Sequence, residues 1–140
     1  MRAAGRVVLR RLKRGDEIRV LALSRSLGGL VRYNGVAVAD IAFARGRLES
    51  MGLRVAFGRH VMECNDHLTA PTASRLDDLH EAVADPSVAG ILAVSGGVGA
   101  IQLLDRIDYD LLARSPKILC GYSDIAYLCG LAIYAAAESA

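Results

Sequence analysis

The spacing of apolar residues changes along the chain, and these changes predict strands that alternate with helices. Short apolar runs predict four strands, at residues 18–23, 53–57, 88–94 and 118–120. Blocks in which apolar residues recur every three or four positions predict helices, at residues 41–51, 76–83, 101–104, 109–113 and 125–137. The stretch 24–34 is rich in serine and glycine and is predicted to be a loop.

Three local signals predict where helices begin and end. Gly52 stands where the glycine that follows a helix belongs. Ser74, with Asp77 three residues later, resembles the capping box at the start of a helix. Pro86 ends that helix, because the residue before a proline is pushed out of the helical region.

The alternation of strands and helices predicts an α/β fold with a parallel sheet flanked by helices. Residues 88–94 are almost all apolar, as expected for a strand covered on both faces, whereas 53–57 alternates and is expected nearer the sheet edge. Residues 118–120 are expected to form a buried strand. Ligands of such sheets bind beyond the carboxyl ends of the strands. Three loops are therefore expected to meet at one edge of the sheet, at residues 24–26, 95–100 and 121–124.

Composition narrows the class of protein. With 140 residues, 53% of them hydrophobic, the chain is long enough for one domain with a packed core. Its net charge of +2 is too small to predict a nucleic-acid partner. The most apolar segment, 125–137, is too short to span a membrane, so no membrane partner is expected. The three cysteines lack metal-ligand spacing and indicate reduced thiols in a cytoplasmic protein.

Basic residues crowd the beginning of the chain, where no acidic residue precedes Asp16. This pattern predicts a basic extension over residues 1–11, with the folded domain covering 12–140. A basic arm and a transit-like leader both share the arginine-rich, acid-poor composition. Because the segment has little serine and no clear amphipathic period, we interpret it as a frayed or misassigned N-terminal extension.

The stretch from Ile118 to Ala126 combines a short apolar run, a glycine, a serine and the start of an apolar helix. This order is typical of a nucleophile elbow, in which a tight turn lifts a hydroxyl, here that of Ser123, above the sheet edge. The free N–H groups at the start of the helix would suit an oxyanion. On this stretch alone the simpler interpretation, that Ser123 is the N-cap of that helix, is favoured, because serine is a preferred cap residue.

The run of glycines at Gly96, Gly97 and Gly99 is open to three interpretations. It could cradle a phosphate or dinucleotide, although it matches neither full glycine-rich motif. It could supply half of an oxyanion hole whose second donor is the N–H of Asp124. It could also only permit a tight strand-to-helix turn.

A serine nucleophile needs a general base, and the chain offers three histidines. His60 ends the second predicted strand, His67 lies in the polar segment after it, and His80 is expected on the solvated face of a helix. Each could reach Ser123 only by an unusual excursion of the chain, so none is a convincing base.

The same stretches carry a resemblance to a known family. The central pieces are ILAVSGG at 91–97, QLL at 102–104, IDYDLL at 107–112 and PKILCGYSDI at 116–125. Supporting pieces are LKRGD at 12–16, SRS at 24–26, GRHV at 58–61 and RLDDLH at 75–80. In this order and spacing the chain resembles the N-terminal domain of the LD-carboxypeptidases, which are serine peptidases. The branch of microcin-immunity peptidases is the most similar, and the resemblance covers residues 12–136.

The resemblance implies a flavodoxin-like domain in which Ser123 is the nucleophile. The oxyanion donors would be the N–H groups of Gly97 and Asp124, and Gly96 and Val98 would contact the substrate. Family members cut an amide between an L- and a D-centre in murein peptides, in the cytoplasm. The microcin branch instead cleaves an acidic residue from a nucleotide-like toxin. The family uses a Ser-Glu-His triad without a metal or other cofactor, and its members are commonly dimers.

The chain departs from the family pattern in three ways. The triad glutamate and histidine belong to a C-terminal domain, whereas this sequence stops at Ala140. Ser95 stands where the family usually has a larger residue, and Ala126 replaces a usual threonine. Val98 and its successors differ from the residues that follow the glycine pair in the microcin branch.

The sequence thus leaves two expectations about function. The leading one is the nucleophile-bearing half of an LD-carboxypeptidase, inactive alone, with a separate C-terminal half or a second copy as partner. The alternative is a small nucleotide- or phosphate-binding module that uses the loop from Gly96 to Gly99.

Overall fold

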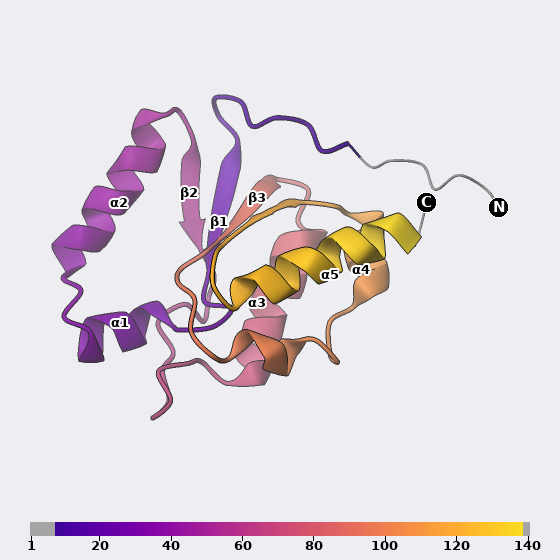
Figure 1. Cartoon of the computed structure of the whole chain (residues 1–140). Helices are drawn as coiled ribbons and strands as arrows, with labels where there is room; N and C mark the ends of the chain where they lie inside the picture. Colours follow the sequence, from indigo (N-terminus) through magenta and orange to yellow (C-terminus); the bar gives the residue numbers. More distant parts are fainter. Residues whose placement is uncertain (1–7, 139–140) are drawn as a thin grey trace.

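A four-stranded parallel sheet forms the centre of the computed structural model, which describes residues 8–138 (Figure 1). The central strands are β1 (Glu17–Leu21) and β3 (Val88–Ala93), and the edges are β2 (Arg54–Phe57) and β4 (Ile118–Cys120). The order β2-β1-β3-β4, with every pair parallel, is the order found in flavodoxin-like sheets. The predicted α/β fold is confirmed.

Six helical segments connect and flank the strands. They are α1 (Leu27–Tyr33), α2 (Val38–Ser50), α3 (Thr72–Ala84), the 3-10 helix η1 (Ala100–Leu103), α4 (Tyr109–Arg114) and α5 (Ile125–Glu138). Figure 1 shows α1 and α2 at the β2 side of the sheet, with α3, α4 and α5 at the β3 side. Across residues 8–138, no helix combines the length and the apolar character that a membrane span requires.

The main core lies between the sheet, α3, η1 and α5. Its fully buried side chains include Leu21, Leu23, Leu103 and Ile125. A smaller cluster beside α1 contains Ala22, Leu27 and Val61. By contrast α2 has no buried residue. The carboxyl ends of β1, β3 and β4 therefore lie next to the larger of the two core clusters.

Helix α1 lies inside the stretch 24–34 that the sequence predicts to be a loop, so that prediction is wrong. Ser26 is its N-cap, and the side-chain oxygen accepts a hydrogen bond from the N–H of Gly29 (2.9 Å). A Cβ added at Gly28 would lie 2.1 Å from the carbonyl oxygen of Met62. The serine and glycine content that suggests a loop instead serves a capped helix packed tightly against another segment.

Three smaller predictions also need correction. The capping box at Ser74 is wrong, because α3 begins at Thr72 with Pro71 as its N-cap. The helix expected at 101–104 is a 3-10 helix at 100–103. The strand 118–120 lies at the sheet edge and is only half-buried, with Cys120 exposed.

Other boundary predictions are confirmed. Gly52 follows α2 with φ +87°, the left-handed conformation expected of a glycine at a helix C-terminus. Strand β2 lies at the sheet edge and β3 in its centre, as the alternating and continuous apolar patterns indicate.

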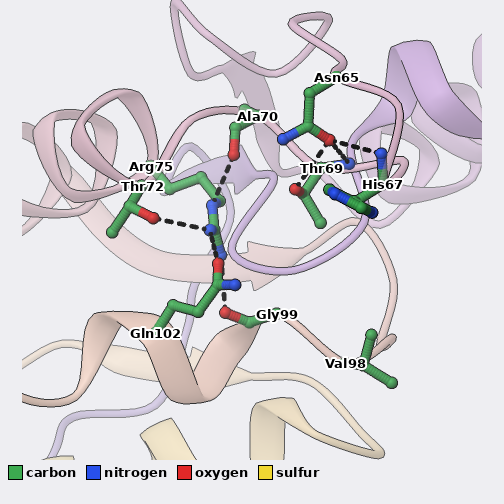
Figure 2. Close-up of a pocket in the computed structure, with 9 residues that line it drawn as sticks. All are labelled: Asn65, His67, Thr69, Ala70, Thr72, Arg75, Val98, Gly99 and Gln102. Atoms are coloured by element: carbon green, nitrogen blue, oxygen red, sulfur yellow. Dashed lines mark hydrogen bonds between the residues drawn. The ribbon is translucent and has the colours of Figure 1, made fainter.

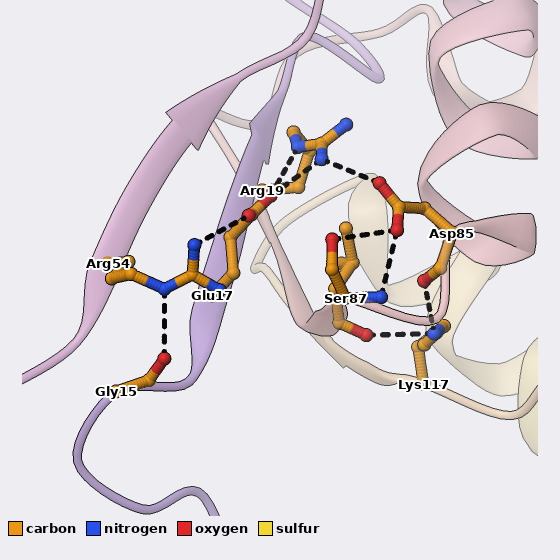
Figure 3. A network of polar contacts seen from close by, with 8 residues as sticks. Gly15, Glu17, Arg19, Arg54, Asp85, Ser87 and Lys117 are labelled. Carbon is orange, nitrogen blue, oxygen red and sulfur yellow. Dashed lines mark hydrogen bonds and ion pairs between the residues drawn. The ribbon is translucent and has the colours of Figure 1, made fainter.

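A network of charged side chains ties the amino ends of the strands together (Figure 3). Arg19 donates to Glu17 Oε1 (2.6 Å) and to Asp85 Oδ2 (3.2 Å), which joins β1 to the end of α3. Lys117 Nζ donates to the carbonyl oxygens of Asp85 and Val88 (both 2.8 Å), which fixes the approach to β4. At this edge of the sheet, these charged side chains therefore bind other groups of the same chain.

The predicted basic extension falls partly outside the described residues, since residues 1–7 are not among them. Within the described part, Arg10 forms two hydrogen bonds to the carboxylate of Asp16 (2.6 and 2.9 Å), and the N–H of Lys13 donates a third (2.8 Å). These hydrogen bonds, with that from Arg10 contributing most, lower the pKa of Asp16 to about 2.

Candidate active site

A sharp turn joins β4 to α5 and carries Ser123. Ser123 is exposed and adopts φ +59°, a left-handed conformation that is strained for a residue with a side chain. A Cβ added at Gly121 would lie 2.3 Å from Cγ2 of Ile125, so only glycine fits at the start of the turn. A strained strand-to-helix turn that exposes a serine has the geometry of a nucleophile elbow.

The side chain of Ser123 does not cap α5. Among the described residues, Ser123 Oγ accepts no hydrogen bond from the first turn of the helix. The main-chain carbonyl of Ser123 accepts from the N–H of Ala126 (3.0 Å), and that of Tyr122 accepts from the N–H of Ile125 (3.3 Å). The interpretation of Ser123 as a helix cap is therefore not supported, and its hydroxyl can meet a ligand.

The glycine loop, residues 95–100, packs directly against this turn. A Cβ added at Gly96 would lie 2.6 Å from Cβ and 3.1 Å from Oγ of Ser123. A Cβ added at Gly97 would lie 2.6 Å from Oγ of Ser24. These distances leave no room for a side chain, so the glycines bring the backbone close to Ser123 as well as permitting the turn.

A partly buried hydrogen-bond network joins the three loops at this edge. The hydroxyl of Ser24, after β1, donates to Asp124 Oδ2 (2.8 Å) and accepts from the N–H of Gly99 (3.3 Å). The N–H of Ala100 also donates to Asp124 Oδ2 (3.0 Å). The predicted meeting of the loops at 24–26, 95–100 and 121–124 is confirmed. The sequence assigned Asp124 only its backbone N–H and missed its carboxylate.

Arg75, on α3, is a second residue that sequence reasoning missed. Its side chain is buried, with 2% of its surface exposed. Its guanidinium has a hydrogen-bond acceptor for every N–H: the carbonyl oxygens of Ala70, Leu23 and Gly99, Thr72 Oγ1 and Gln102 Oε1. A signal was present in the sequence, because Arg75 lies four residues before Leu79 on the buried stripe of α3.

The peptide group between Gly99 and Ala100 is held from both sides. Its carbonyl oxygen accepts from Arg75 Nη1 (2.8 Å), while its N–H donates to the carboxylate of Asp124. Burial lowers the pKa of Arg75, and the nearby charge of Asp124 acts in the opposite direction. One buried cation and one carboxylate thus fix the plane of a glycine-loop peptide that lies three residues from Gly96.

Comparison with known proteins supports this geometry. The sequence profile of the LD-carboxypeptidase N-terminal domain matches residues 18–139. The chain belongs to the LD-carboxypeptidase family. It is 43% identical to the "Putative carboxypeptidase YocD" of Bacillus subtilis over 89% of this chain and 36% of that protein. It is 39% identical to the murein tetrapeptide carboxypeptidase of Pseudomonas aeruginosa over 59% of this chain and 27% of that protein.

Solved structures of the family share the fold. The MccF-like protein of Bacillus anthracis superposes with a TM-score of 0.77 at 42% identity, over 84% of this chain and 34% of that one. The microcin C7 self-immunity protein MccF in complex with aspartyl sulfamoyl adenosine superposes with a TM-score of 0.74 at 28% identity, over 95% of this chain and 38% of that one. The chain therefore spans about a third of the length of its relatives.

Two of the three histidines of this LD-carboxypeptidase domain, His60 and His80, are engaged away from Ser123. His60 pairs with Glu63 (2.6 Å) and Asp77 (3.2 Å), and these hydrogen bonds, mainly that to Glu63, raise its pKa. His80 Nε2 accepts from the N–H of Asp108 (3.0 Å) and is half-buried rather than solvated. Within the described residues, none of the three histidines hydrogen-bonds to Ser123.

A hollow of about 410 Å³ opens beside the glycine loop (Figure 2). Its walls are the glycine loop, η1, the start of α3 and the segment before it. The residues that line it are Asn65, His67, Thr69, Ala70, Thr72, Arg75, Val98, Gly99 and Gln102. Among residues 8–138, no group of three His, Cys, Asp or Glu side chains gathers closely enough to hold a metal ion.

Proposed function

We propose that this domain supplies the nucleophile and the oxyanion donors of a serine-type LD-carboxypeptidase. Ser123 Oγ attacks the carbonyl carbon of the substrate amide, and the N–H groups of Gly97 and Asp124 bind the oxyanion that forms. The observation that carries the proposal is the exposed, strained Ser123 turn held against the glycine loop by the Asp124 carboxylate. Collapse of the tetrahedral intermediate releases the amine and leaves an acyl group on Ser123, which water then hydrolyses.

The proposed substrate is an amide in a murein peptide or in a peptide linked to a nucleotide. One relative is named for murein tetrapeptide, and another structure holds aspartyl sulfamoyl adenosine. Gly96 and Val98 are proposed to contact this substrate, since Gly96 adjoins Ser123 and the side chain of Val98 is 86% exposed. A cytoplasmic location would give the domain access to recycled murein peptides.

The general base is proposed to come from outside these 140 residues. His60 and His80 are engaged elsewhere, and among the described residues the His67 side chain makes no hydrogen bond to Ser123. Removal of a triad base typically leaves only residual catalysis from oxyanion binding. We therefore propose that the isolated domain is inactive and that a glutamate and a histidine reach Ser123 from a C-terminal half or a second copy.

The alternative of a phosphate-binding module receives less support from the geometry. The N–H groups of Gly99 and Ala100 are already bound by Ser24 and Asp124, so they are not free to cradle a phosphate. A phosphate there would also meet the carboxylate of Asp124, whose buried Oδ1 has no hydrogen-bond partner among the described residues.

The experiment that tests the proposed function measures D-alanine release from murein tetrapeptide. The isolated chain is expected to release none that depends on Ser123. A chimera in which this domain replaces the matching region of the Pseudomonas aeruginosa murein tetrapeptide carboxypeptidase is expected to release D-alanine, and Ser123→Ala in the chimera to abolish release. A folded chimera with equal activity after Ser123→Ala would contradict the assignment of the nucleophile.

A further inference from the structure

The hollow in Figure 2 presents hydrogen-bond donors that no residue of the described chain uses. Its lining contains amide, hydroxyl, imidazole and guanidinium groups and no carboxylate. A ligand that supplies acceptor oxygens would therefore complement it, whereas a cation would not. The first question is which of these donors are free.

Arg75 is not one of them. Each of its five N–H groups already has an acceptor in the chain, so its guanidinium cannot turn toward a ligand without breaking a buried hydrogen bond. Its effect on the hollow is indirect. Because arginine only donates, Gln102 must point its oxygen at Arg75 Nη2 (2.5 Å), and the NH₂ of Gln102 is then directed away from the guanidinium.

Asn65 is oriented in the same way on the opposite wall. Its Oδ1 accepts from the N–H groups of His67 (2.9 Å) and Thr69 (3.2 Å) and from the Thr69 hydroxyl (3.2 Å). The side-chain oxygen is committed to these donors, so the NH₂ group remains. Figure 2 shows the amides of Asn65 and Gln102 on opposite sides of the hollow, and neither NH₂ has a hydrogen-bond partner among the described residues.

The wall that carries Asn65 is held rigidly. Leu68 adopts φ +64°, a strained conformation that is uncommon outside functional sites and tight turns. Its carbonyl oxygen accepts from the N–H of Ser26 (2.9 Å), and Thr69 pairs with Arg25 in an isolated β-bridge. The strain is thus maintained by contacts to the start of α1, and the donor of Asn65 is positioned before a ligand arrives.

The glycine loop connects the hollow with the Ser123 turn. Gly99 lines the hollow and Gly96 adjoins Ser123, and three residues of extended chain span no more than about 11 Å. The carboxylate carbon of a single leaving residue lies about 3.8 Å from the carbonyl that is attacked, and a hydrogen bond adds about 2.9 Å. A donor that binds this carboxylate must therefore lie about 7 Å from the reacting carbon, which is compatible with the upper limit set by the loop.

We propose that the NH₂ groups of Asn65 and Gln102 bind the C-terminal carboxylate of the peptide whose last residue is removed. The identity of the ligand rests on the proposed function, while the site itself rests on the geometry of the hollow. The site would make the enzyme a carboxypeptidase, because an internal peptide bond offers no carboxylate at this distance from Ser123.

The test is an NMR titration of the ¹⁵N-labelled chain, read at the side-chain NH₂ resonances of Asn65 and Gln102. The probes are acetyl-L-lysyl-D-alanine, its C-terminal carboxamide, and inorganic phosphate. We expect the free acid to shift both resonances and to bind at least tenfold more tightly than the carboxamide. Equal binding of acid and carboxamide, or tighter binding of phosphate, overturns the proposal.

Two isosteric variants sharpen the test. Gln102→Glu and Asn65→Asp keep the oxygen that Arg75 and the Thr69 segment require, and replace the NH₂ with an oxygen. Each is expected to weaken binding of the free acid at least tenfold while the remaining backbone resonances stay in place. Asn34→Asp, at the exposed end of α1, adds the same charge away from the hollow and is the matched control.

These outcomes separate the site from the proposed reaction. Undiminished binding in both variants overturns the site even if Ser123 proves to be the nucleophile. Binding that follows the expected pattern upholds the site even if the chimera shows no hydrolysis that depends on Ser123.

Discussion

The two ends of the same sheet carry polar networks of opposite character. At the amino ends, Arg19, Asp85 and Lys117 pair with one another or with backbone carbonyls (Figure 3). At the carboxyl ends, the buried Arg75 and the half-buried Asp124 also bind within the chain, but they hold loops that present unused groups outward. An exposed hydroxyl at Ser123 remains there, together with the NH₂ groups of Asn65 and Gln102, which have no partner among residues 8–138.

The difference shows how a structural network and a site network can be told apart. A network that only stabilises the fold ends with its own donors and acceptors satisfied. At the carboxyl edge one buried acceptor, Asp124 Oδ1, has no partner among the described residues, and two residues, Ser123 and Leu68, are strained. Such residues are expected where the backbone must meet a ligand.

The largest expected effect contrasts an arginine from each end. Arg75→Leu should lower the free energy of unfolding by about 3–5 kcal/mol, because it leaves the buried carbonyls of Leu23, Ala70 and Gly99 without their donor and removes the positive charge near Asp124. Arg54→Leu removes a side chain that is 62% exposed and should cost less than about 1 kcal/mol. Urea unfolding measures both, and similar costs for the two would refute the proposed contrast.

A medium effect is expected where the glycine loop meets the Ser123 turn. Gly96→Ala places a Cβ 2.6 Å from Cβ of Ser123, so the two loops must separate, at a cost of about 1–3 kcal/mol. The control is Gly46→Ala in α2, where a Cβ meets nothing within 4 Å and should add about 0.5–1 kcal/mol of stability. Thermal unfolding of both variants checks the signs, and a neutral Gly96→Ala would show that the contact is loose.

The smallest effect concerns the amino end and depends on pH. Asp16 has a pKa of about 2 in the folded chain, below its ordinary value of 3.8, so its contribution to stability is complete above about pH 4 and is lost as pH falls toward 2. The stability difference between wild type and Asp16→Asn should shrink over that range in urea unfolding. A difference that stays constant from pH 5 to 2 would show that the Arg10 pairing does not persist in solution.

Much of the fold could be predicted from local patterns. The continuous apolar run at 88–94 and the alternating run at 53–57 placed the central and edge strands, because side-chain periodicity reports how many faces of a strand are covered. Composition misled at 24–34, where serine and glycine serve a capped helix. The loop prediction failed because glycine is required at Gly28 by the close approach of Met62, a residue remote in the sequence.

The candidate site could also be predicted only where its residues are neighbours in the sequence. Ser123 and the glycine loop could be identified from the sequence, since a strand, a turn and a helix are contiguous and leave a motif. The carboxylate of Asp124 and the guanidinium of Arg75 could not be assigned in this way, because the partners that join them to the glycine loop and Ser24 lie 24 to 100 residues away. The position of Arg75 on the apolar stripe of α3 was the sequence feature that indicated a buried charge.

By itself the sequence determined the order of strands and helices, the elbow motif and the family, because each of these is written in neighbouring residues. The tertiary structure alone decided which polar groups are consumed inside the fold and which remain for a ligand. Hydrogen bonding allows each donor few partners, and those partners are chosen only when loops from β1, β3 and β4 meet at one edge.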